Sequence, residues 1–194
     1  MRVLLVTAHP LIGSFHGLLQ STIIEALHEA GHEIDLCDLY AENFEPVLSV
    51  GARERYFDTA VNRSGVESYV ERLMRTEALV LCFPVWCFGP PAILKGFMDR
   101  VLIPGVSFAL GSDGRMHPNL RHIKRLVAVT TYGRSRLDAW FIGDPPRKIV
   151  KRYLRWFIAR DAHVRYVPLY NLHRREAQDH SGFIRRVSRV MRDL

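Results

Sequence analysis

Five short apolar runs are spaced along the chain, and segments with helical periodicity separate them. Residues 2–8 and 78–83 are almost entirely apolar and rich in valine and leucine. Such runs are typical of strands buried on both faces of a parallel sheet. Residues 33–40 alternate apolar and acidic side chains, which indicates a strand nearer a sheet edge. Two further strands are predicted at 125–131 and 164–170.

The segments between these runs predict helices. The clearest begins at Ser14 and ends before Gly31, because its apolar residues recur at helical spacing and a glycine follows. Residues 50–60 show helical spacing within an otherwise mixed segment. We expect further helices at 66–76, 92–101, 146–159 and 178–191.

Strands that alternate with helices predict an α/β fold, a three-layer sandwich with helices on both faces of a five-stranded parallel sheet. Five strands in 194 residues favour the flavodoxin-like order 2-1-3-4-5 in a single domain, residues 1–194. In this order the first, third and fourth strands are neighbours. A ligand is therefore expected at their carboxyl ends, where the winding reverses. We expect the loops at residues 9–16, 84–91 and 130–136 to form this ligand site.

Composition and cysteine spacing exclude several classes of protein. A share of 48% hydrophobic and 24% charged residues is that of an ordinary globular chain, neither disordered nor of low complexity. Cys37, Cys82 and Cys87 form no CxxC pair, which argues against a disulfide framework or a zinc ribbon and favours a reducing compartment.

The apolar segments are too short or too interrupted for a membrane protein. The apolar start of the chain is shorter than the core of a signal peptide. The longest uncharged stretch, 78–94, is broken by Pro84, Pro90 and Pro91, so it cannot form a spanning helix. We therefore expect no stable membrane insertion and a cytoplasmic location.

The net charge of +7 is concentrated in the last quarter of the chain. Residues 145–194 hold 13 Lys and Arg against 4 Asp and Glu, a balance of +9, whereas residues 1–144 hold 14 against 16, a balance of −2. This charge is compatible with solvated helix faces, a phosphorylated cofactor, an acidic membrane surface or nucleic acid. No recognition-helix, zinc-finger or RNP motif accompanies it, so we expect no nucleic-acid partner.

The first loop allows two interpretations. Gly13 and Ser14 stand just before a helix, where backbone N–H groups and a hydroxyl can bind a phosphate. Ser14 could equally cap the helix. His9 could donate to the same phosphate or pack as a structural residue. The loop matches neither GxGxxG nor GxxxxGK[ST], so the usual nucleotide fingerprints are absent.

The other two loops suit a planar heterocycle. The second combines prolines, which restrict the backbone, with aromatic residues that form either a flat apolar wall or an inward-packed cluster. Cys82 and Cys87 are predicted to be unreactive, since no activating base is recognisable nearby. The third loop offers hydroxyls, backbone amides and Arg134 to the polar edge of a ring, although its Gly133 could serve only as a turn.

Three segments resemble one family. HPLIGSFHGLL (9–19), FPVWCFGPPAILKGFMDRVLIPGVSF (83–108) and VAVTTYG (127–133) are similar to the flavodoxin-like NAD(P)H:quinone oxidoreductases. Together they cover about a quarter of the chain, and the PAxLKGxxDRVxxPGxxF spacing of the middle segment is distinctive.

The resemblance implies a flavin site made of the three loops. Around the flavin phosphate or pyrophosphate it places His9, Ser14, Phe15 and His16. Along the isoalloxazine ring it places Pro84, Val85, Trp86, Cys87 and Phe88, and at the pyrimidine edge Thr130, Thr131 and Gly133. Phe108 matches an aromatic that lines the substrate pocket across a dimer interface. Tyr132 stands where the family often has glycine, so we expect it to crowd or cap the ring.

The implied activity is hydride transfer by a ping-pong mechanism. The cofactor is FAD, with FMN as the alternative, the co-substrate is NADPH or NADH, and the acceptor is a quinone or a similar electrophile. A homodimer with the site at its interface is also implied. The flavin carries the chemistry, so no catalytic side chain and no metal ligand is assigned.

The chain departs from the family after the third loop. The tyrosine and histidine that form a charge relay in family members have no counterpart in residues 137–146, which contain Trp140 and Phe141 instead. Two other functions are considered. A flavodoxin-type electron carrier would normally be acidic and carry a threonine-rich phosphate loop, which is missing here. A regulatory flavoprotein subunit of a cation-efflux system would use the same site.

Overall fold

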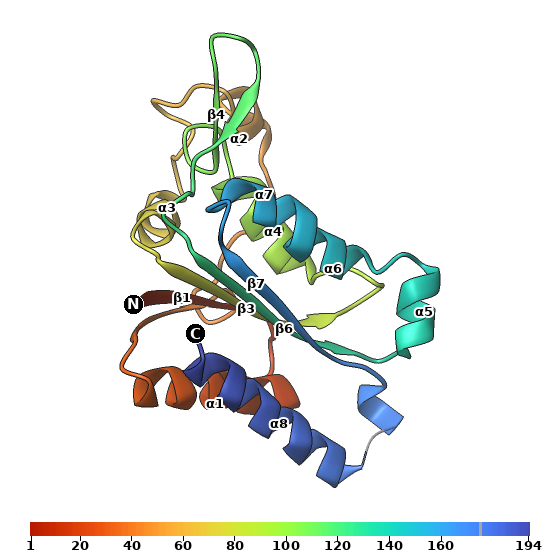
Figure 1. Cartoon of the computed structure of the whole chain (residues 1–194). Coiled ribbons are helices and arrows are strands. Elements are labelled where there is room, and N and C mark those ends of the chain that lie inside the picture. Colours follow the sequence, from red (N-terminus) through yellow and green to blue (C-terminus); the bar gives the residue numbers. More distant parts are fainter. Residues whose placement is uncertain (175) are drawn as a thin grey trace.

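The main sheet of the computed structural model has five parallel strands in the order β2-β1-β3-β6-β7 (Figure 1). The structure describes residues 1–174 and 176–194. All five predicted strands are present and the predicted order, counted in chain sequence, is confirmed. The strands are β1 (Arg2–Thr7), β2 (Glu33–Asp38), β3 (Ala78–Val85), β6 (Arg125–Tyr132) and β7 (His163–Leu169).

Helices cover both faces of this sheet (Figure 1). On one face, α1 (Phe15–Glu29) and α8 (Ala177–Arg192) bury Leu19, Ile23 and Phe183 against Val3 and Val80. Because successive strand residues point to opposite faces, the neighbouring residues of the same strands form the second core cluster. That cluster contains residues of α3 (Glu67–Met74) and α4 (Ala92–Val101).

The helix expected at 146–159 has an unusual middle. It starts as α6 (Pro145–Lys148), continues through a π-helical stretch, η1 (Ile149–Leu154), and ends as α7 (Arg155–Phe157). It packs on the same face as α4 through Val150 and Leu154. Because it runs back over the sheet, its start lies at the carboxyl edge and its end at the amino edge.

Other elements differ from the expectation. The helix expected at 50–60 is only α2 (Val50–Glu54), and none of its residues is buried, so no apolar contact extends it. The hairpin of β4 (Phe108–Leu110) and β5 (Met116–Pro118) was not predicted. Nor were α5 (Arg136–Phe141) and the short 3₁₀ helix η2 (Leu172–Arg174).

Two further findings concern membrane-spanning helices and the cysteine thiols. Within 1–174 and 176–194, no helix has both the length and the apolar character needed to cross a bilayer. Cys37, Cys82 and Cys87 are free thiols, and burial raises the pKa of Cys37 and of Cys82 to about 12.

Candidate functional site

A buried histidine joins the carboxyl ends of two strands to the first turn of α1. The Nε2 atom of His16 lies 2.7 Å from Oγ1 of Thr131 at the end of β6, and its Nδ1 atom lies 3.7 Å from Sγ of Cys82 in β3. The ring of His9, from the loop after β1, stacks on His16 at 5.2 Å. The loops after β1, β3 and β6 therefore meet at one edge of the sheet, as the strand order predicted.

Burial gives His16 an unusual titration. Only 5% of this residue is exposed, and desolvation together with the nearby charge of His9 lowers the pKa of His16 from 6.5 to about 3. The imidazole is therefore neutral in the folded protein at ordinary pH. The thiol of Cys82 also stays protonated, since burial raises its pKa, so this centre is uncharged.

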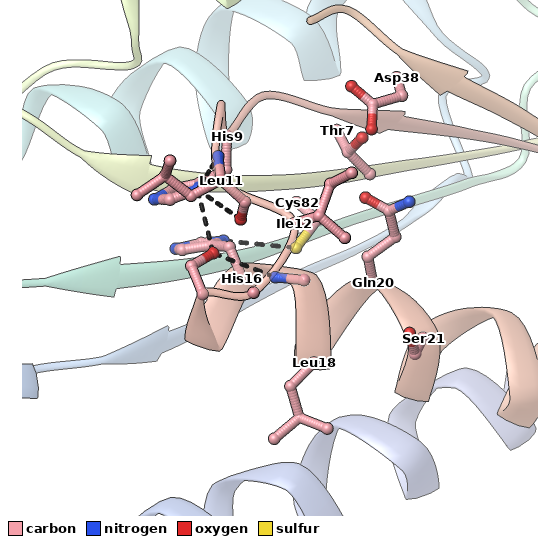
Figure 2. Close-up of a pocket in the computed structure, with 13 residues that line it drawn as sticks. Thr7, His9, Leu11, Ile12, His16, Leu18, Gln20, Ser21, Asp38 and Cys82 are labelled. Carbon is pink, nitrogen blue, oxygen red and sulfur yellow. Dashed lines mark hydrogen bonds between the residues drawn. The ribbon is translucent and has the colours of Figure 1, made fainter. Parts of the chain in front are cut away.

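A first cavity of about 290 Å³ opens beside this centre. The loop after β1 and the first turns of α1 form one side of it, and Figure 2 shows Thr7, Gln20 and Asp38 grouped at the opposite end from the two histidines. The lining residues are Thr7, His9, Leu11, Ile12, Gly13, Ser14, His16, Gly17, Leu18, Gln20, Ser21, Asp38 and Cys82.

Ser14 is the N-cap of α1. Its Oγ accepts a hydrogen bond from the backbone N–H of Gly17 at 3.3 Å and lies 3.0 Å from Nδ1 of His9. The same Nδ1 accepts from the backbone N–H of Leu11 at 3.1 Å and lies 3.3 Å from the carbonyl oxygen of Leu11. The capping interpretation of Ser14 is confirmed. The phosphate role of Ser14 stays a prediction.

Gly17 was not singled out from the sequence, although a glycine in the first turn of a helix is a recognisable signal. A Cβ at this position would lie 1.8 Å from the carbonyl oxygen of Ile12. The loop after β1 therefore folds directly onto the start of α1. Only glycine permits this close approach, because any side chain would collide with backbone.

The loop after β3 contains a strained turn. Trp86 and Gly89 exchange two backbone hydrogen bonds, of 3.0 and 2.8 Å, and the two residues between them are left-handed, Cys87 with φ 49° and Phe88 with φ 56°. Two positive φ values define a type I′ turn, which normally uses glycine or asparagine. Holding other residues there costs on the order of 1 kcal/mol each, and such strain concentrates at ligand sites.

The side chains of this turn divide between the core and the surface. Val85 and Phe88 pack partly against the core and also line a cavity, so the two interpretations are not exclusive for them. Trp86 is 42% exposed, and its ring lies 6.0 Å from that of His9. The loop after β3 thus also contacts the loop after β1.

A second cavity, of about 240 Å³, lies between the loops after β3 and β6. Its walls combine apolar side chains with one glycine and one cation at the end of the third loop. The lining residues are Val85, Cys87, Phe88, Tyr132, Gly133 and Arg134.

The hydroxyl of Tyr132 lies in the core instead of in this cavity. It donates to Oδ1 of Asp144 at 2.6 Å and lies 2.5 Å from the hydroxyl of Tyr166, and the residue is only 1% exposed. Burial, followed by the neighbouring Tyr166, raises the pKa of Tyr132, so the phenol remains a donor. Asp144 reaches Tyr132 through a left-handed backbone, φ 46°, just after Gly143. These hydrogen bonds of Tyr132 with Asp144 and Tyr166 restrain the third loop from the side of the core.

The predicted site residues are distributed as follows. The first cavity is lined by His9, Ser14 and His16, and the second by Val85, Cys87, Phe88, Tyr132 and Gly133. Four others line neither cavity but stand next to residues that do, or contact them: Phe15, Pro84, Trp86 and Thr131. Thr130 lines neither cavity and is fully buried within β6.

Phe108 lies elsewhere. It is 8% exposed at the start of β4 and packs near the ring of Phe157, at 6.3 Å. It lines neither of the two cavities, so its place beside a partner's substrate pocket stays a prediction.

Comparisons with known proteins agree on the fold. Residues 1–173 match the model of a family described as having a flavodoxin-like fold. Ribosyldihydronicotinamide dehydrogenase (quinone) of Pongo abelii is 32% identical over 154 residues, which is 70% of this chain and 65% of that protein. NAD(P)H dehydrogenase (quinone) 1 of Rattus norvegicus is 30% identical over 148 residues, 68% of this chain and 54% of that protein.

The chain thus matches between about half and two thirds of the length of these relatives. The solved structure of an NAD(P)H:quinone oxidoreductase from Methanothermobacter marburgensis has a TM-score of 0.81 with this chain at 24% identity. The structural match covers 100% of this chain and 96% of the archaeal chain, which shows a shared fold.

The low pKa of His16 predicts an acid-sensitive apoprotein. Below pH 6.5 the unfolded chain binds a proton at residue 16 that the folded chain does not bind, down to about pH 3, so stability falls as the pH falls. Between pH 6.5 and about pH 5, the free energy of unfolding should lose about 2 kcal/mol through this residue. Urea unfolding of wild type and His16→Asn should show a smaller loss in the variant. Equal losses would contradict the assignment.

The contact between Gly17 and Ile12 predicts opposite effects for two identical substitutions. Gly17→Ala should destabilise the protein by about 1–3 kcal/mol, because the new methyl group displaces the loop. Gly182→Ala, within α8, meets only the end of Arg185 at 3.9 Å and should stabilise by about 0.5–1 kcal/mol through helix propensity. Chemical denaturation measures both. A neutral Gly17→Ala would show that the loop moves freely.

Proposed function

We propose that this chain, which belongs to a family with a flavodoxin-like fold, is a flavin-dependent oxidoreductase. It transfers hydride from NADPH or NADH to a quinone or a similar electrophilic acceptor. The observation that carries the proposal is the pair of cavities along one sheet edge, connected through the contacts of His16 and His9. The names of the matched relatives support the same activity.

The first cavity fits the phosphate-bearing tail of a flavin. The N–H groups of Phe15 and His16 stand in the first turn of α1, where helical residues have no intrahelical acceptor and the helix dipole favours an anion. Among the described residues that line the cavity there is no lysine or arginine, so backbone N–H groups and hydroxyls would bind the phosphate. Oγ1 of Thr7 is buried and has no hydrogen-bond partner among the described residues, which suits a hydroxyl of the ligand.

The second cavity fits the ring. Val85 and Phe88 supply an apolar wall that would exclude water from one side of the ring. The N–H groups of Trp86 and Gly89 are used within the turn, so those of Cys87 and Phe88 would be its donors to the ring. Gly133 leaves room at the opposite side, and Arg134 places a cation nearby. A ring bound between the two loops would be held by shape and by backbone donors.

When bound, the flavin supplies the redox chemistry by accepting a hydride from NAD(P)H and passing it to the acceptor. The residues of the chain position the reactants and set the electrostatics. Arg134 and the amides near Gly133 favour negative charge at the polar edge of the ring. The Tyr132–Asp144–Tyr166 network restrains the third loop, and we assign no proton transfer to it because its hydroxyls lie in the core.

The finer parts of the proposal concern cofactor, assembly and location. We propose FAD, with FMN as the alternative. A homodimer is supported by the exposed apolar side chains of α5, where Trp140 is 73% and Phe141 85% exposed next to the third loop. Phe108 would then lie beside the partner's pocket. Three free thiols fit the reducing cytoplasm.

Replacing Ser14 with aspartate separates its two roles. Aspartate is as good an N-cap as serine, so Ser14→Asp should keep the stability of α1. Its negative charge should weaken flavin binding by about tenfold or more, because it lies where the phosphate binds. Ser49→Asp is the matched control, since Ser49 is the N-cap of α2 and accepts from the N–H of Ala52 at 3.2 Å.

The flavin affinity is measured by titrating the apoprotein with FAD and with FMN while flavin fluorescence is monitored. Tighter binding of FMN would reverse the choice of cofactor. Unchanged affinity in Ser14→Asp would remove Ser14 from the phosphate site. Failure of the wild type to bind either flavin, together with no quinone-stimulated oxidation of NAD(P)H, would overturn the proposed function.

A further inference from the structure

A strongly basic groove lies at the opposite edge of the sheet from the two cavities. Its volume is about 490 Å³, and it lies between β5 and the end of helix 145–157. The segments that form it precede strands. Leu120 donates to the carbonyl of Phe157 just before β6, and Ala159 donates to the carbonyl of Ile123 before β7. The groove therefore belongs to the amino edge and is separate from the proposed flavin site.

Four arginines line the groove: Arg121, Arg152, Arg155 and Arg160. Among the described residues that line it there is no carboxylate. In residues 1–174 and 176–194, none of the four forms an ion pair with a carboxylate. Cations gathered in this way repel one another, and a bound anion would relieve that repulsion.

Arg155 is already held in place. Its guanidinium donates to the backbone carbonyl of Ala159 at 2.6 Å and to that of Arg160. Neutral carbonyls fix the side chain but leave its positive charge uncompensated. One member of the cluster is thus ordered before any ligand arrives, which lowers the entropic cost of binding.

An exposed tryptophan stands among these arginines. Trp156 is 42% exposed and lines the groove, and its ring meets that of buried Phe157 edge-on at 5.2 Å. An indole beside several guanidinium groups offers a surface for an aromatic ring next to donors for phosphate oxygens. A phosphate-bearing lipid headgroup would use the arginines but not this ring.

The arrangement of charge argues for a compact ligand. The remaining arginines of the last quarter include Arg185, Arg186 and Arg189, which are exposed on α8. Helix α8 covers one face of the sheet and helix 145–157 covers the other (Figure 1). The basic charge is therefore split between two faces, whereas a nucleic-acid strand needs a continuous basic track. The groove volume falls within the range of small-ligand sites.

We propose that this groove binds a nucleotide polyphosphate. The arginines bind the phosphate oxygens, and the indole of Trp156 stacks on the base. The site is additional to the flavin site and does not depend on the proposed redox activity.

The experiment is calorimetric titration of the full chain with ATP, with and without saturating flavin. ATP should bind in both conditions. Arg152→Glu should weaken binding by about tenfold or more, because it replaces a phosphate donor with a repelling charge. Arg186→Glu, the same change on α8, is the matched control and should alter the affinity less than about twofold. If Arg152→Glu does not fold, Arg121→Ala replaces it, with the same direction expected.

Trp156→Ala tests the base contact. This substitution should weaken ATP binding by about tenfold, because stacking on the base is lost, and should leave the affinity for inorganic pyrophosphate unchanged. No ATP binding at millimolar concentration, equal losses in Arg152→Glu and Arg186→Glu, or complete displacement by flavin would each overturn the proposal. An equal effect of Trp156→Ala on pyrophosphate would also overturn it. So would binding of phosphatidylserine vesicles, sensitive to Arg152→Glu, without ATP binding.

Discussion

The site depends on one buried, uncharged imidazole. His16 is the point at which the start of α1 contacts the ends of β3 and β6, and no charged side chain could replace it at this depth without a partner. A neutral histidine can accept at one nitrogen and donate at the other, so it satisfies two neighbours at once. The first and third loops are thereby held at a set separation, with the stacked ring of His9 extending the contact toward Trp86.

Around this centre the backbone is restricted in two different ways. Gly17 lets the first loop fold against its own helix, and the left-handed Cys87 and Phe88 give the second loop a turn that ordinary residues resist. The stability of the fold alone explains neither feature, because a loop with an unrestricted backbone would have a lower free energy. Both are explained if the backbone N–H groups must line a binding site, since backbone donors can be aimed only by bending the chain.

The two edges of the sheet carry opposite electrostatic designs. At the carboxyl edge the described lining of the first cavity has no lysine or arginine, so an anion there would be bound by the helix terminus and neutral donors. At the amino edge four arginines line one groove without a carboxylate among the described lining residues. Among the described lining residues of the two cavities none comes from the basic last quarter, and Arg134 of the second cavity precedes that quarter.

The sequence by itself determined the five strands of the main sheet and their order, because buried strands, helix caps and turns leave signals within a few residues of one another. It also identified Ser14 as a helix cap, whereas local sequence cannot separate this role from the predicted phosphate contact, because both would use the same atoms. Tertiary structure decided the rest. His16 meets Thr131 across 115 residues of chain, and the hydroxyl of Tyr132 turns into the core because Asp144 is brought to it by a left-handed backbone. The groove likewise forms only where the hairpin of β4 and β5 meets helix 145–157, two segments that lie far apart in the chain. Such contacts depend on distance in space, which no local periodicity records.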